Sequence, residues 1–426
     1  MAKPQQPQDL TPAPLDGRPH VVIVGAGFGG LACAQALGGA AARVTVIDRR
    51  NYNLFVPLLY QVATAALSPA DIATPIRRAL ARFKNIDVIM AEAVGLDLKA
   101  KRVRLADQGY VPYDHLVLAT GSVYNYFGHE DWARNAPGLK TIDNARSIRR
   151  RVLQAFEDAE KTADADRQTE LMTVAIVGGG PTGVEIAGAI GELARHSLAG
   201  DFQRVDPKRA RILLIEAGPK LLAHFPDPLP AYALKTLQGA GVEVRLNTKV
   251  ETIEPDAIRA GGEHIRAATI IWGAGIRGGD GADWVAAPAD PSGRIRVAPN
   301  LSVPGADGVY ALGDLASLDQ DGRPLPALAQ VAKQQGRHLG WALRRSLDDG
   351  SRPPAFRFQD RGDTAVIGRH AAVYSIGALQ MAGLLAWLLW ALVHVFLLIG
   401  VDKRMLVVTQ WAWRYLTNER GARLID

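Results

Sequence analysis

The sequence is poor in cysteine, with Cys33 as the only one among its 426 residues. One thiol cannot form an internal disulfide, and it cannot supply the ligands of an iron–sulfur cluster or of a four-cysteine zinc site. We therefore predict no metal site, and any redox chemistry must come from a bound organic cofactor. We expect Cys33 itself to be a small packed residue and not a reactive thiol.

The N-terminal end lacks an apolar run that would serve as a signal peptide. Residues 1–19 contain five prolines among polar residues. We expect them to form a flexible tail on a protein that stays in the cytosol. The net charge of +6 is small for a chain of this length. It predicts no nucleic-acid partner.

Charge is missing near the other end, where no Asp, Glu, Lys or Arg occurs from His370 to Val401. The most apolar part, Met381 to Val401, is long enough to cross a bilayer as one helix, which needs about 20 residues. Half of the eight tryptophans lie in or just after it, and basic residues follow. These features are typical of a segment at the cytoplasmic leaflet. Spanning the membrane, lying in one leaflet and forming a buried core helix all remain open.

The residues that are present point first to nucleotide binding. The β-branched run Val21 to Val24 leads into Gly25, Gly27 and Gly30 at G-x-G-x-x-G spacing, and small residues of a predicted helix follow. The first glycine permits a tight turn, the second lets backbone approach a pyrophosphate, and the third allows close packing of helix on strand. Asp48 ends the next predicted strand, where a carboxylate holds ribose hydroxyls. A glycine-rich structural turn is the alternative.

The same construction recurs later in the chain. A strand through Val177 leads into Gly178, Gly180 and Gly183, and another predicted strand ends at Glu216. Two such units predict two dinucleotides. Because Glu216 is acidic and not an arginine, it favours an unphosphorylated ribose, hence NADH over NADPH.

Three further strand ends carry small or acidic residues. Apolar strands end at Thr120-Gly121 and at Gly275, and a third leads to Gly313 and Asp314. A carboxylate at Asp314 can accept hydrogen bonds from the hydroxyls of a ribityl chain. An ordinary Gly-Asp turn explains this motif equally well.

Together these motifs resemble the flavoproteins with two dinucleotide-binding domains. Within that superfamily the chain is closely similar to the type II NADH dehydrogenases, the single-subunit, non-pumping NADH:quinone oxidoreductases. The segments that carry the resemblance are Asn53 to Arg77, Asn125 to Glu160, GGGPTGVE, Ala329 to Gly336, Thr364 to Val373 and the tryptophan-rich tail. They extend over essentially everything after residue 19.

The resemblance implies an α/β fold with two Rossmann-like domains of the glutathione-reductase-like type and a helical C-terminal membrane anchor. The implied domains are an FAD-binding part at 20–135, an NADH-binding domain at 136–289, a return part of the FAD domain with the quinone-site helix at 290–365, and a membrane-anchoring region at 366–426. FAD would be bound tightly but non-covalently, and NADH would be the substrate. A hydride would pass to flavin N5, and two electrons and two protons would then reach a membrane quinone without ion pumping. The enzyme would act at the cytoplasmic face of the cell membrane, in contact with lipid, and a homodimer stays open.

The cofactor-binding residues that we predict on this basis are Gly25, Gly27, Phe28, Gly29, Gly30, Asp48, Arg49, Thr120, Gly121, Gly178, Gly180, Thr182, Gly183, Glu216, Gly275, Gly313, Asp314, Ala332 and Lys333.

Three residues are predicted to be catalytic. Gln330 and Gln334 are four apart, so on a helix they present two amides on one face, while Gln335 points elsewhere. An amide can bind a quinone carbonyl without burying a charge. A solvated helix face is the alternative. Glu185 is predicted to orient nicotinamide or to relay protons to quinone, although a capping box of Thr182 and Glu185 would also explain it. Tyr60 and Gln61 lie near the isoalloxazine or are structural.

Three other functions share some of these features. A sulfide:quinone oxidoreductase needs cysteine chemistry that Cys33 alone cannot supply. A soluble NAD(P)H oxidase or ferredoxin reductase fits the cofactors but not the apolar tail. A non-enzymatic membrane flavoprotein would bind the nucleotides without turnover.

Overall fold

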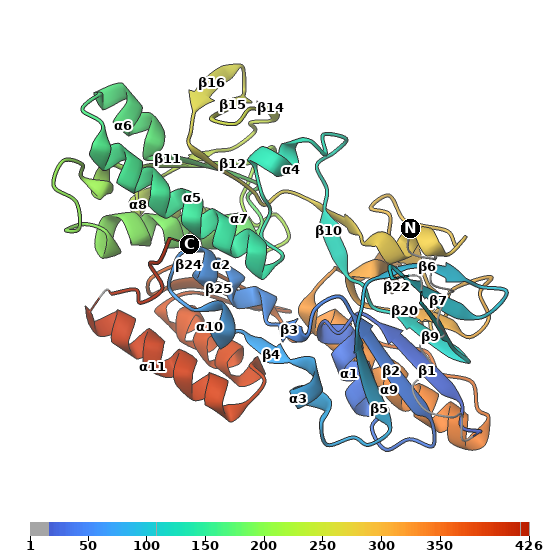
Figure 1. Ribbon diagram of the computed structural model, residues 1–426. Helices are drawn as coiled ribbons and strands as arrows, with labels where there is room; N and C mark the ends of the chain where they lie inside the picture. Colours follow the sequence, from blue (N-terminus) through green and yellow to red (C-terminus); the bar gives the residue numbers. More distant parts are fainter. Residues whose placement is uncertain (1–16, 108, 418, 426) are drawn as a thin grey trace, which may run out of the picture. The chain divides into compact units, whose positions relative to one another are not determined.

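The computed structural model describes residues 17–107, 109–417 and 419–425 (Figure 1). The predicted tail therefore lies almost entirely outside the described residues. The chain divides into two compact units, each built from separate segments of the sequence. Unit 1 contains the chain up to Leu54, Thr74–Val123 and Ile276–Gln359, and unit 2 contains Phe55–Ala73, Tyr124–Gly275 and the chain from Asp360 onwards. The unit boundaries after Val123, Gly275 and Gln359 each precede the corresponding predicted domain boundary, which falls after residue 135, 289 or 365.

Unit 1 is built on a five-stranded sheet in the order β20-β9-β1-β2-β5, with parallel pairing throughout. Its strands are β1 (His20–Val24), β2 (Arg43–Asp48), β5 (Ile86–Met90), β9 (His115–Leu118) and β20 (Val309–Ala311). All five residues of β1 are buried. This is the pattern of a parallel sheet that is covered on both faces.

A second, antiparallel sheet in unit 1 has the order β6-β7-β8. Its strands are β6 (Ala93–Asp97), β7 (Arg102–Leu105) and β8 (Tyr110–Pro112). Val103 and Val111 share a hydrophobic core with Leu116 of β9. The small sheet therefore packs against the parallel one.

Helices α1 (Phe28–Ala36) and α9 (Ala329–Asp349) of unit 1 cross at glycines. A Cβ added to Gly336 would overlap the carbonyl oxygen of Gly29, and one added to Gly340 would lie 2.6 Å from that of Cys33. The two helices therefore approach backbone to backbone. Cys33 is fully buried, and its burial raises the pKa of the thiol to about 12. It is the packed residue that the sequence predicts.

Unit 2 repeats this plan on a four-stranded parallel sheet in the order β13-β12-β11-β17. Its strands are β11 (Thr173–Val177), β12 (Arg211–Ile215), β13 (Val242–Arg245) and β17 (Thr269–Trp272), and α7 (Pro181–Glu192) connects β11 to β12. An antiparallel sheet of β14 (Val250–Ile253), β15 (Ala257–Ala260) and β16 (Glu263–Arg266) shares its core. The predicted α/β class with two βαβ units is confirmed.

Further helices complete unit 2, and α5 shows how its sequence determines its position. The helices are α2 (Leu59–Ala63), α4 (Trp132–Asn135), α5 (Ile142–Lys161), α6 (Ala165–Leu171) and α8 (Leu229–Gly239). In α5, Ile148, Val152 and Phe156 recur every four residues and are buried. Thr141 caps this helix by accepting a hydrogen bond from the Asn144 amide at 3.0 Å.

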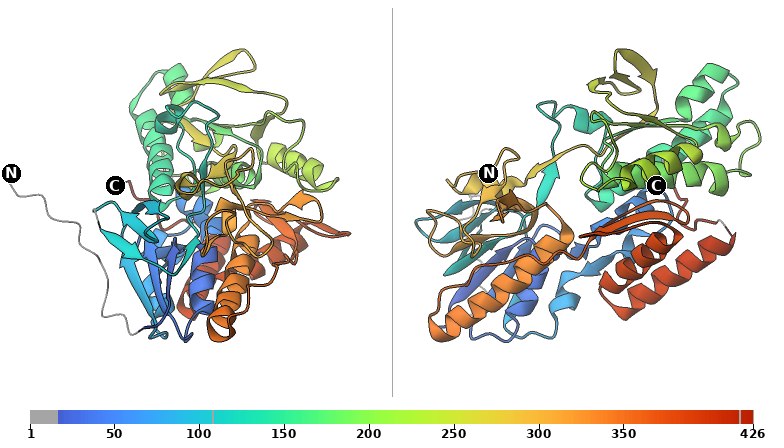
Figure 2. Two further views of the ribbon diagram at one scale, coloured as in Figure 1. Left: turned by 90° about the vertical axis from the view of Figure 1, so that its right-hand side faces the viewer. Right: turned by 180° about the vertical axis from the view of Figure 1, so that it is seen from behind.

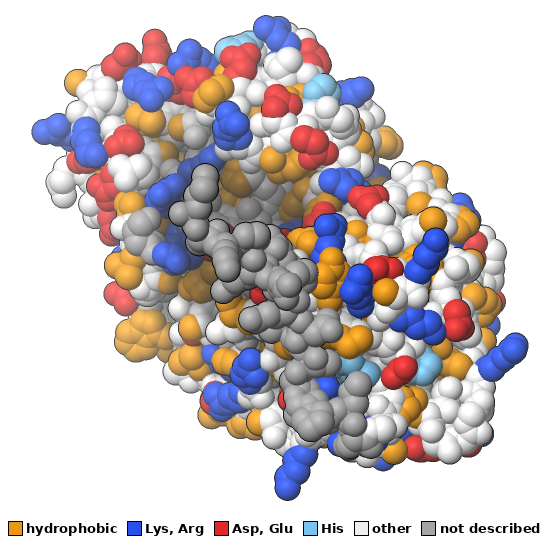
Figure 3. All heavy atoms as spheres, turned by 45° about the vertical axis from the view of Figure 1, so that its right-hand side comes forward, with side chains coloured by type: hydrophobic (Ala, Val, Ile, Leu, Met, Phe, Trp, Pro, Cys, Tyr) orange, Lys and Arg blue, Asp and Glu red, His pale blue; other side chains and the backbone are white. Residues whose placement is uncertain are grey.

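Short elements make the remaining connections. They are β3 (Tyr52–Leu54), β4 (Ala73–Pro75), α3 (Ile76–Leu80), β10 (Ser122–Tyr124), β18 (Ile276–Gly278), β19 (Ile295–Arg296), β21 (Ala316–Ser317), β22 (Asp319–Gln320) and β23 (Arg323–Pro324). On the face drawn in Figure 3, Lys and Arg side chains are interspersed with Asp and Glu, so charge of one sign is not gathered there.

The C-terminal part forms an antiparallel sheet and two helices that lie side by side (Figure 2). They are β24 (Asp363–Gly368), β25 (Ala371–Ile376), β26 (Leu379–Gly383), α10 (Leu384–Leu397) and α11 (Val401–Thr417). The stretch Met381 to Val401 is thus not one helix, which corrects that expectation. Met381 pairs in β26, and Gly383 and Gly400, both at positive φ, bound the turns on either side of α10. Among the described residues, no helix has the length and apolar character to cross a bilayer.

Helix α10 is apolar apart from His394. Ala386, Trp390 and His394, four residues apart, are buried against the rest of unit 2. Leu385, Leu392 and Phe396 face outwards and are 69%, 68% and 69% exposed. A helix that is apolar all round normally has both faces covered. The packing of the fold therefore does not explain why the outer face of α10 is apolar.

Replacing Gly336 by alanine is expected to destabilise unit 1, because the new methyl group overlaps the Gly29 carbonyl and pushes α1 and α9 apart. Such overpacking costs about 1–3 kcal/mol. Urea unfolding followed by circular dichroism measures the loss. The matched control is Gly239→Ala in α8, where an added Cβ meets nothing within 4 Å and stability should hold or rise slightly. Equal losses in both variants would contradict the close crossing.

Candidate active site

The two βαβ turns carry the same set of hydrogen bonds. In unit 1, the Asp48 carboxylate accepts from the amides of Ala26 at 2.7 Å and Arg50 at 2.8 Å. In unit 2, the Glu216 carboxylate accepts from the amides of Gly179 at 2.5 Å and Gly218 at 2.6 Å. A carboxylate has about four lone-pair positions, so each can also accept from a ribose hydroxyl. Both acids thus hold their glycine loops in place and retain capacity for a ligand.

The glycines of these turns have two different surroundings. A Cβ on Gly30 or Gly183 would overlap the carbonyl oxygen of the first glycine in its own motif, so only glycine lets helix and strand approach. A Cβ on Gly27 or Gly180 would meet nothing within 4 Å. The second glycines therefore face open space at the N-termini of α1 and α7, where backbone N–H groups favour a pyrophosphate. The packing role of the third glycines is confirmed, and pyrophosphate binding stays a prediction.

The other predicted residues of unit 1 gather at the ends of β9 and β20. Among the described residues, the buried Thr120 hydroxyl has no hydrogen-bond partner. Asp314 accepts from the Ser122 hydroxyl at 2.8 Å. A Cβ on Gly313 would lie 3.2 Å from the Ala332 methyl. A buried hydroxyl without a partner is uncommon in a folded protein, and a bound ligand would satisfy it.

Gln335 is a residue whose importance the sequence analysis missed. It is 1% exposed, and its Oε1 accepts from the Gly313 amide at 2.7 Å, which fixes the loop that carries Asp314. We expected its side chain to point away from the site. One feature of the sequence could have indicated this role, namely the neighbouring Gly336. Because Gly336 has no side chain, this face of α9 can pack closely against α1.

The two other glutamines of α9 are partly buried. The Gln334 side chain is paired with the backbone of Gln359, donating to its carbonyl at 2.8 Å and accepting from its amide at 3.0 Å. This pairing uses part of the amide and leaves one N–H and one lone pair. The predicted contacts of Gln330 and Gln334 with quinone stay predictions.

The remaining predicted cofactor residues differ in exposure. Lys333 and Arg49 are exposed, and Arg49 lies 3.7 Å from Glu92 in an ion pair. Phe28 is partly buried at the first position of α1. Gly121 adopts a φ of 76°, and an added Cβ there would meet nothing within 4 Å. Each of these roles stays a prediction.

A cavity of about 420 Å³ lies within unit 2. Its lining comes from α2, α7, β24, α10 and α11, and includes Tyr60, Gln61, Glu185, Val366, Leu388, Trp390, Trp411 and Arg420. The Gln61 amide donates to the Tyr60 hydroxyl at 2.9 Å and accepts from the Trp411 indole at 2.8 Å. Trp411 stacks on Trp390, whose buried indole N–H has no partner among the described residues. The surface of the cavity is therefore mainly apolar, although five Glu and Arg side chains also line it: Glu185, Glu192, Arg369, Arg414 and Arg420.

Glu185 is an acid that this cavity keeps protonated. Burial raises the pKa of its carboxyl to about 8, against the opposing effect of a hydrogen bond from the Val366 backbone. The capping-box alternative is wrong, because α7 begins at Pro181 with Gly180 as its N-cap and without a side-chain cap. Proline favours the first helical position, so the helix starts before Thr182. Thr182 instead hydrogen-bonds Tyr124.

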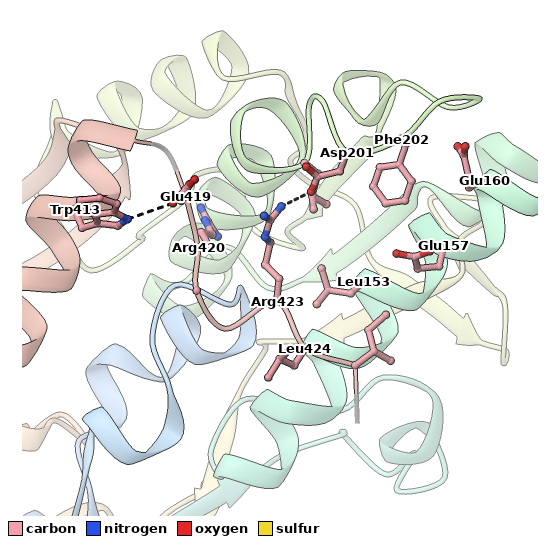
Figure 4. A pocket seen from close by; sticks show the side chains of 13 residues that line it. Leu153, Glu157, Glu160, Asp201, Phe202, Trp413, Glu419, Arg420, Arg423 and Leu424 are labelled. Carbon is pink, nitrogen blue, oxygen red and sulfur yellow. Dashed lines mark hydrogen bonds and ion pairs between the residues drawn. The ribbon is translucent and has the colours of Figure 1, made fainter.

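Two arginines of the C-terminal segment bind it to earlier parts of unit 2. Arg420 donates to the carbonyls of Thr64 at 2.6 Å and Ala189 at 3.3 Å, and Arg423 pairs with Asp201 (Figure 4). Burial lowers the pKa of Arg420 to about 10, so it still carries its charge at neutral pH.

Arg420 lines a second cavity as well, one of about 650 Å³. Carboxylates of Glu157, Glu160, Asp201 and Glu419 surround this second cavity. The lining of this second cavity is therefore acidic, whereas that of the first is mainly apolar. Arg420 lines both cavities.

Comparison with protein families and known proteins gives consistent matches. The family model for pyridine nucleotide-disulphide oxidoreductases matches residues 19–336. The type II NADH:quinone oxidoreductase Ndh of Mycobacterium tuberculosis is 36% identical over 430 residues, which cover 97% of this chain and 92% of that protein. The NdhA protein of the same organism, with the same description, is 38% identical over 435 residues, covering 97% and 91%.

Among solved structures, NDH2 from Plasmodium falciparum in complex with NADH has a TM-score of 0.86 at 18% identity, covering 96% of this chain and 100% of that one. The sulfide:quinone oxidoreductase from Aquifex aeolicus has a TM-score of 0.66 at 18% identity, covering 95% and 92%. At these identities the structures establish a shared fold.

The stability of the protein should depend on pH through Glu185. An unfolded glutamate ionises near pH 4.5, whereas the folded one keeps its proton up to about pH 8. The unfolded state therefore binds fewer protons in this window, and stability falls as pH rises through it. We expect Glu185→Gln, which cannot ionise, to gain several degrees in Tm over the wild type at pH 8.5 and much less at pH 5. The exposed Glu157→Gln should show no such gain, and a pH-independent difference for Glu185→Gln would refute the raised pKa.

Proposed function

The chain belongs to the type II NADH:quinone oxidoreductases, and from this premise we propose that it is an FAD-dependent enzyme that passes two electrons from NADH to a membrane quinone without pumping ions. The observation that carries the proposal is the apolar cavity of unit 2, because it contains an acid that is protonated at neutral pH. A quinone needs such surroundings: apolar walls for its ring and a proton source for its reduced oxygens.

We assign FAD to unit 1. The support is the open space at Gly27, the remaining acceptor capacity of Asp48, and the buried hydroxyl of Thr120, which has no hydrogen-bond partner within the described part of the chain. The chemistry that a flavin supplies when bound is the acceptance of a hydride and its release as two electrons. The residues of the chain hold it without a covalent bond, and Gln335 keeps the Gly313–Asp314 loop in position to receive it.

NADH is assigned to unit 2. Gly180 leaves space for the pyrophosphate at the N-terminus of α7, and Glu216 stands at the end of β12. A carboxylate accepts hydrogen bonds from the 2′- and 3′-hydroxyls of ribose, and it repels the 2′-phosphate of NADPH. The acid therefore supports NADH as the preferred substrate.

The quinone ring is placed in the apolar cavity, and Glu185 is its proton donor. A carboxyl with a pKa of about 8 is mostly protonated at pH 7, so it can donate a proton to a reduced quinone oxygen. The carboxylate would then take up another proton from solvent. Gln61 holds the hydroxyl of Tyr60 and the indole of Trp411, which positions polar groups in the lining. As a separate proposal, which does not depend on this cavity, the amides of Gln330 and Gln334 on α9 of unit 1 bind a quinone carbonyl.

The quinone assignment is tested by comparing two electron acceptors. With a soluble quinone analogue, Glu185→Gln should lower turnover about 10²-fold, the usual contribution of a positioned general acid. With ferricyanide, which takes electrons without protons, the loss should be much smaller. Gln330→Ala/Gln334→Ala should also lower quinone reduction, and Glu157→Gln is the control. If the double variant stays folded and flavinated and reduces quinone at the wild-type rate, the glutamine assignment is wrong.

The C-terminal helices are proposed to attach the protein to the cytoplasmic leaflet of the cell membrane. Leu385, Leu392 and Phe396 of α10 are each more than two-thirds exposed, and Met405 and Leu416 of α11 are 65% and 78% exposed. Contiguous exposed apolar side chains of this extent mark an interaction surface. Lys403, Arg404 and Arg414 lie on the same pair of helices, and basic side chains favour an anionic lipid surface.

Membrane attachment is tested by sedimentation with vesicles that contain anionic phospholipid. Replacing Leu385, Leu392 and Phe396 by serine should weaken vesicle binding at least about a thousandfold, since each buried Leu or Phe side chain contributes about 1.5–3 kcal/mol and tenfold in affinity corresponds to about 1.4 kcal/mol. Met90→Ser, at a position of unit 1 that is 64% exposed, is the control and should bind like the wild type. If the triple variant sediments with the vesicles as the wild type does, these helices do not attach the protein to the membrane.

A further inference from the structure

A four-residue turn in unit 2 holds a phenylalanine in a strained backbone conformation. Phe127 has φ of 54° and Gly128 has φ of 89°, and the amide of His129 donates to the carbonyl of Tyr126 at 3.1 Å. A turn with two central residues at positive φ is usually made by Asn and Gly. A bulky side chain in this region is rare, and such strain tends to persist at functional sites.

The surrounding residues fix this turn firmly. Asn125 accepts from the Phe127 amide at 2.8 Å through its side chain and from the Trp272 indole at 3.1 Å through its carbonyl. Tyr126 stacks on Trp272 with ring centroids 5.0 Å apart, and its hydroxyl donates to the Ala136 carbonyl at 2.9 Å. The strain is therefore maintained by the packing of its neighbours.

The Phe127 ring is largely exposed, so burial in a core does not explain why a phenylalanine occupies this position of the turn. Tyr126, Trp132 and Trp272 are 6%, 7% and 3% exposed, whereas Phe127 is 62% exposed. The ring edge lies over Gly275, where an added Cβ would come within 2.7 Å of the Phe127 Cζ. Gly275 thus makes room for the ring, which gives this predicted cofactor residue a second physical reason to be glycine.

The order of the strands indicates which part of a dinucleotide reaches this ring. The order is β13-β12-β11-β17, with Gly178–Gly183 following β11 and Glu216 following β12. The pyrophosphate binds at the first of these positions and the adenine ribose at the second. The other half of the dinucleotide extends to the opposite side of β11, over the end of β17. Gly275 and Phe127 are located there.

We propose that Phe127 is a substrate-positioning residue whose exposed ring stacks on the nicotinamide of NADH. The assignment deepens the proposed function and rests on NADH binding to unit 2. An aromatic stack of this kind holds a planar ring by its face and fixes its orientation.

The test compares ligands with and without the nicotinamide, using the full-length protein with FAD bound. Dissociation constants are measured by titration calorimetry for NAD⁺ and for ADP-ribose, which lacks the nicotinamide. Phe127→Asn should weaken NAD⁺ binding about fivefold to tenfold and leave ADP-ribose binding within about twofold. Phe127→Tyr should retain both affinities. The control is Trp341→Ala, which removes an aromatic side chain of unit 1 that is 53% exposed.

Thermal unfolding of the same variants separates a binding role from a structural one. Asparagine suits positive φ, so Phe127→Asn should raise Tm while it weakens NAD⁺ binding. A structural residue would lose stability on replacement, and that result, or equal weakening of both ligands, or unchanged NAD⁺ affinity, would overturn the proposal. A wild-type protein that binds NAD⁺ but does not reduce quinone would instead contradict the proposed function and leave the Phe127 assignment standing.

Discussion

Both units depend on the approach of a helix to a strand that only a glycine permits. At Gly30 and Gly183 the hydrogen in place of a side chain lets the helix N-terminus lie against the turn that precedes it. The acids at Asp48 and Glu216 then bind the amides of the same turns. The position of each glycine loop is therefore determined by the chain itself, without any contact to a ligand.

A known motif was enough to predict these elements, because G-x-G-x-x-G spacing with an acid at the end of the next strand defines the βαβ turn even though the acid lies 22 residues from Ala26 in unit 1 and 37 from Gly179 in unit 2. Gln335 shows where such a motif is missing. Its role depends on a contact between α9 and the Gly313 loop, 22 residues apart in sequence, and the i,i+4 spacing of Gln330 and Gln334 suggested the other face of the helix. The capping box failed for a different reason, since Pro181 moved the start of α7 by its own preference for the first helical position.

The apolar C-terminal stretch was recognised from its composition, but not its shape. The hydropathy of this stretch does not reveal that turns at Gly383 and Gly400 interrupt the helix. It also does not reveal that Met381 pairs with Tyr374 in a β-sheet. The cavity beside it was also beyond sequence reasoning, because its lining comes from residues 60–61, 185–192, 366–369 and 384–420. The raised pKa of Glu185 follows from that distant packing, and nothing in its local sequence indicates it.

Arg420 has a consequence for the order in which the protein matures. Its bonds to the carbonyls of Thr64 and Ala189 join the last residues of the chain to helices made much earlier. During synthesis, the glycine loops of both units leave the ribosome long before this arginine does. The glycine loops can therefore take shape before Arg420 is in place, whereas the lining of the apolar cavity is complete only once Arg420 has bonded to Thr64 and Ala189.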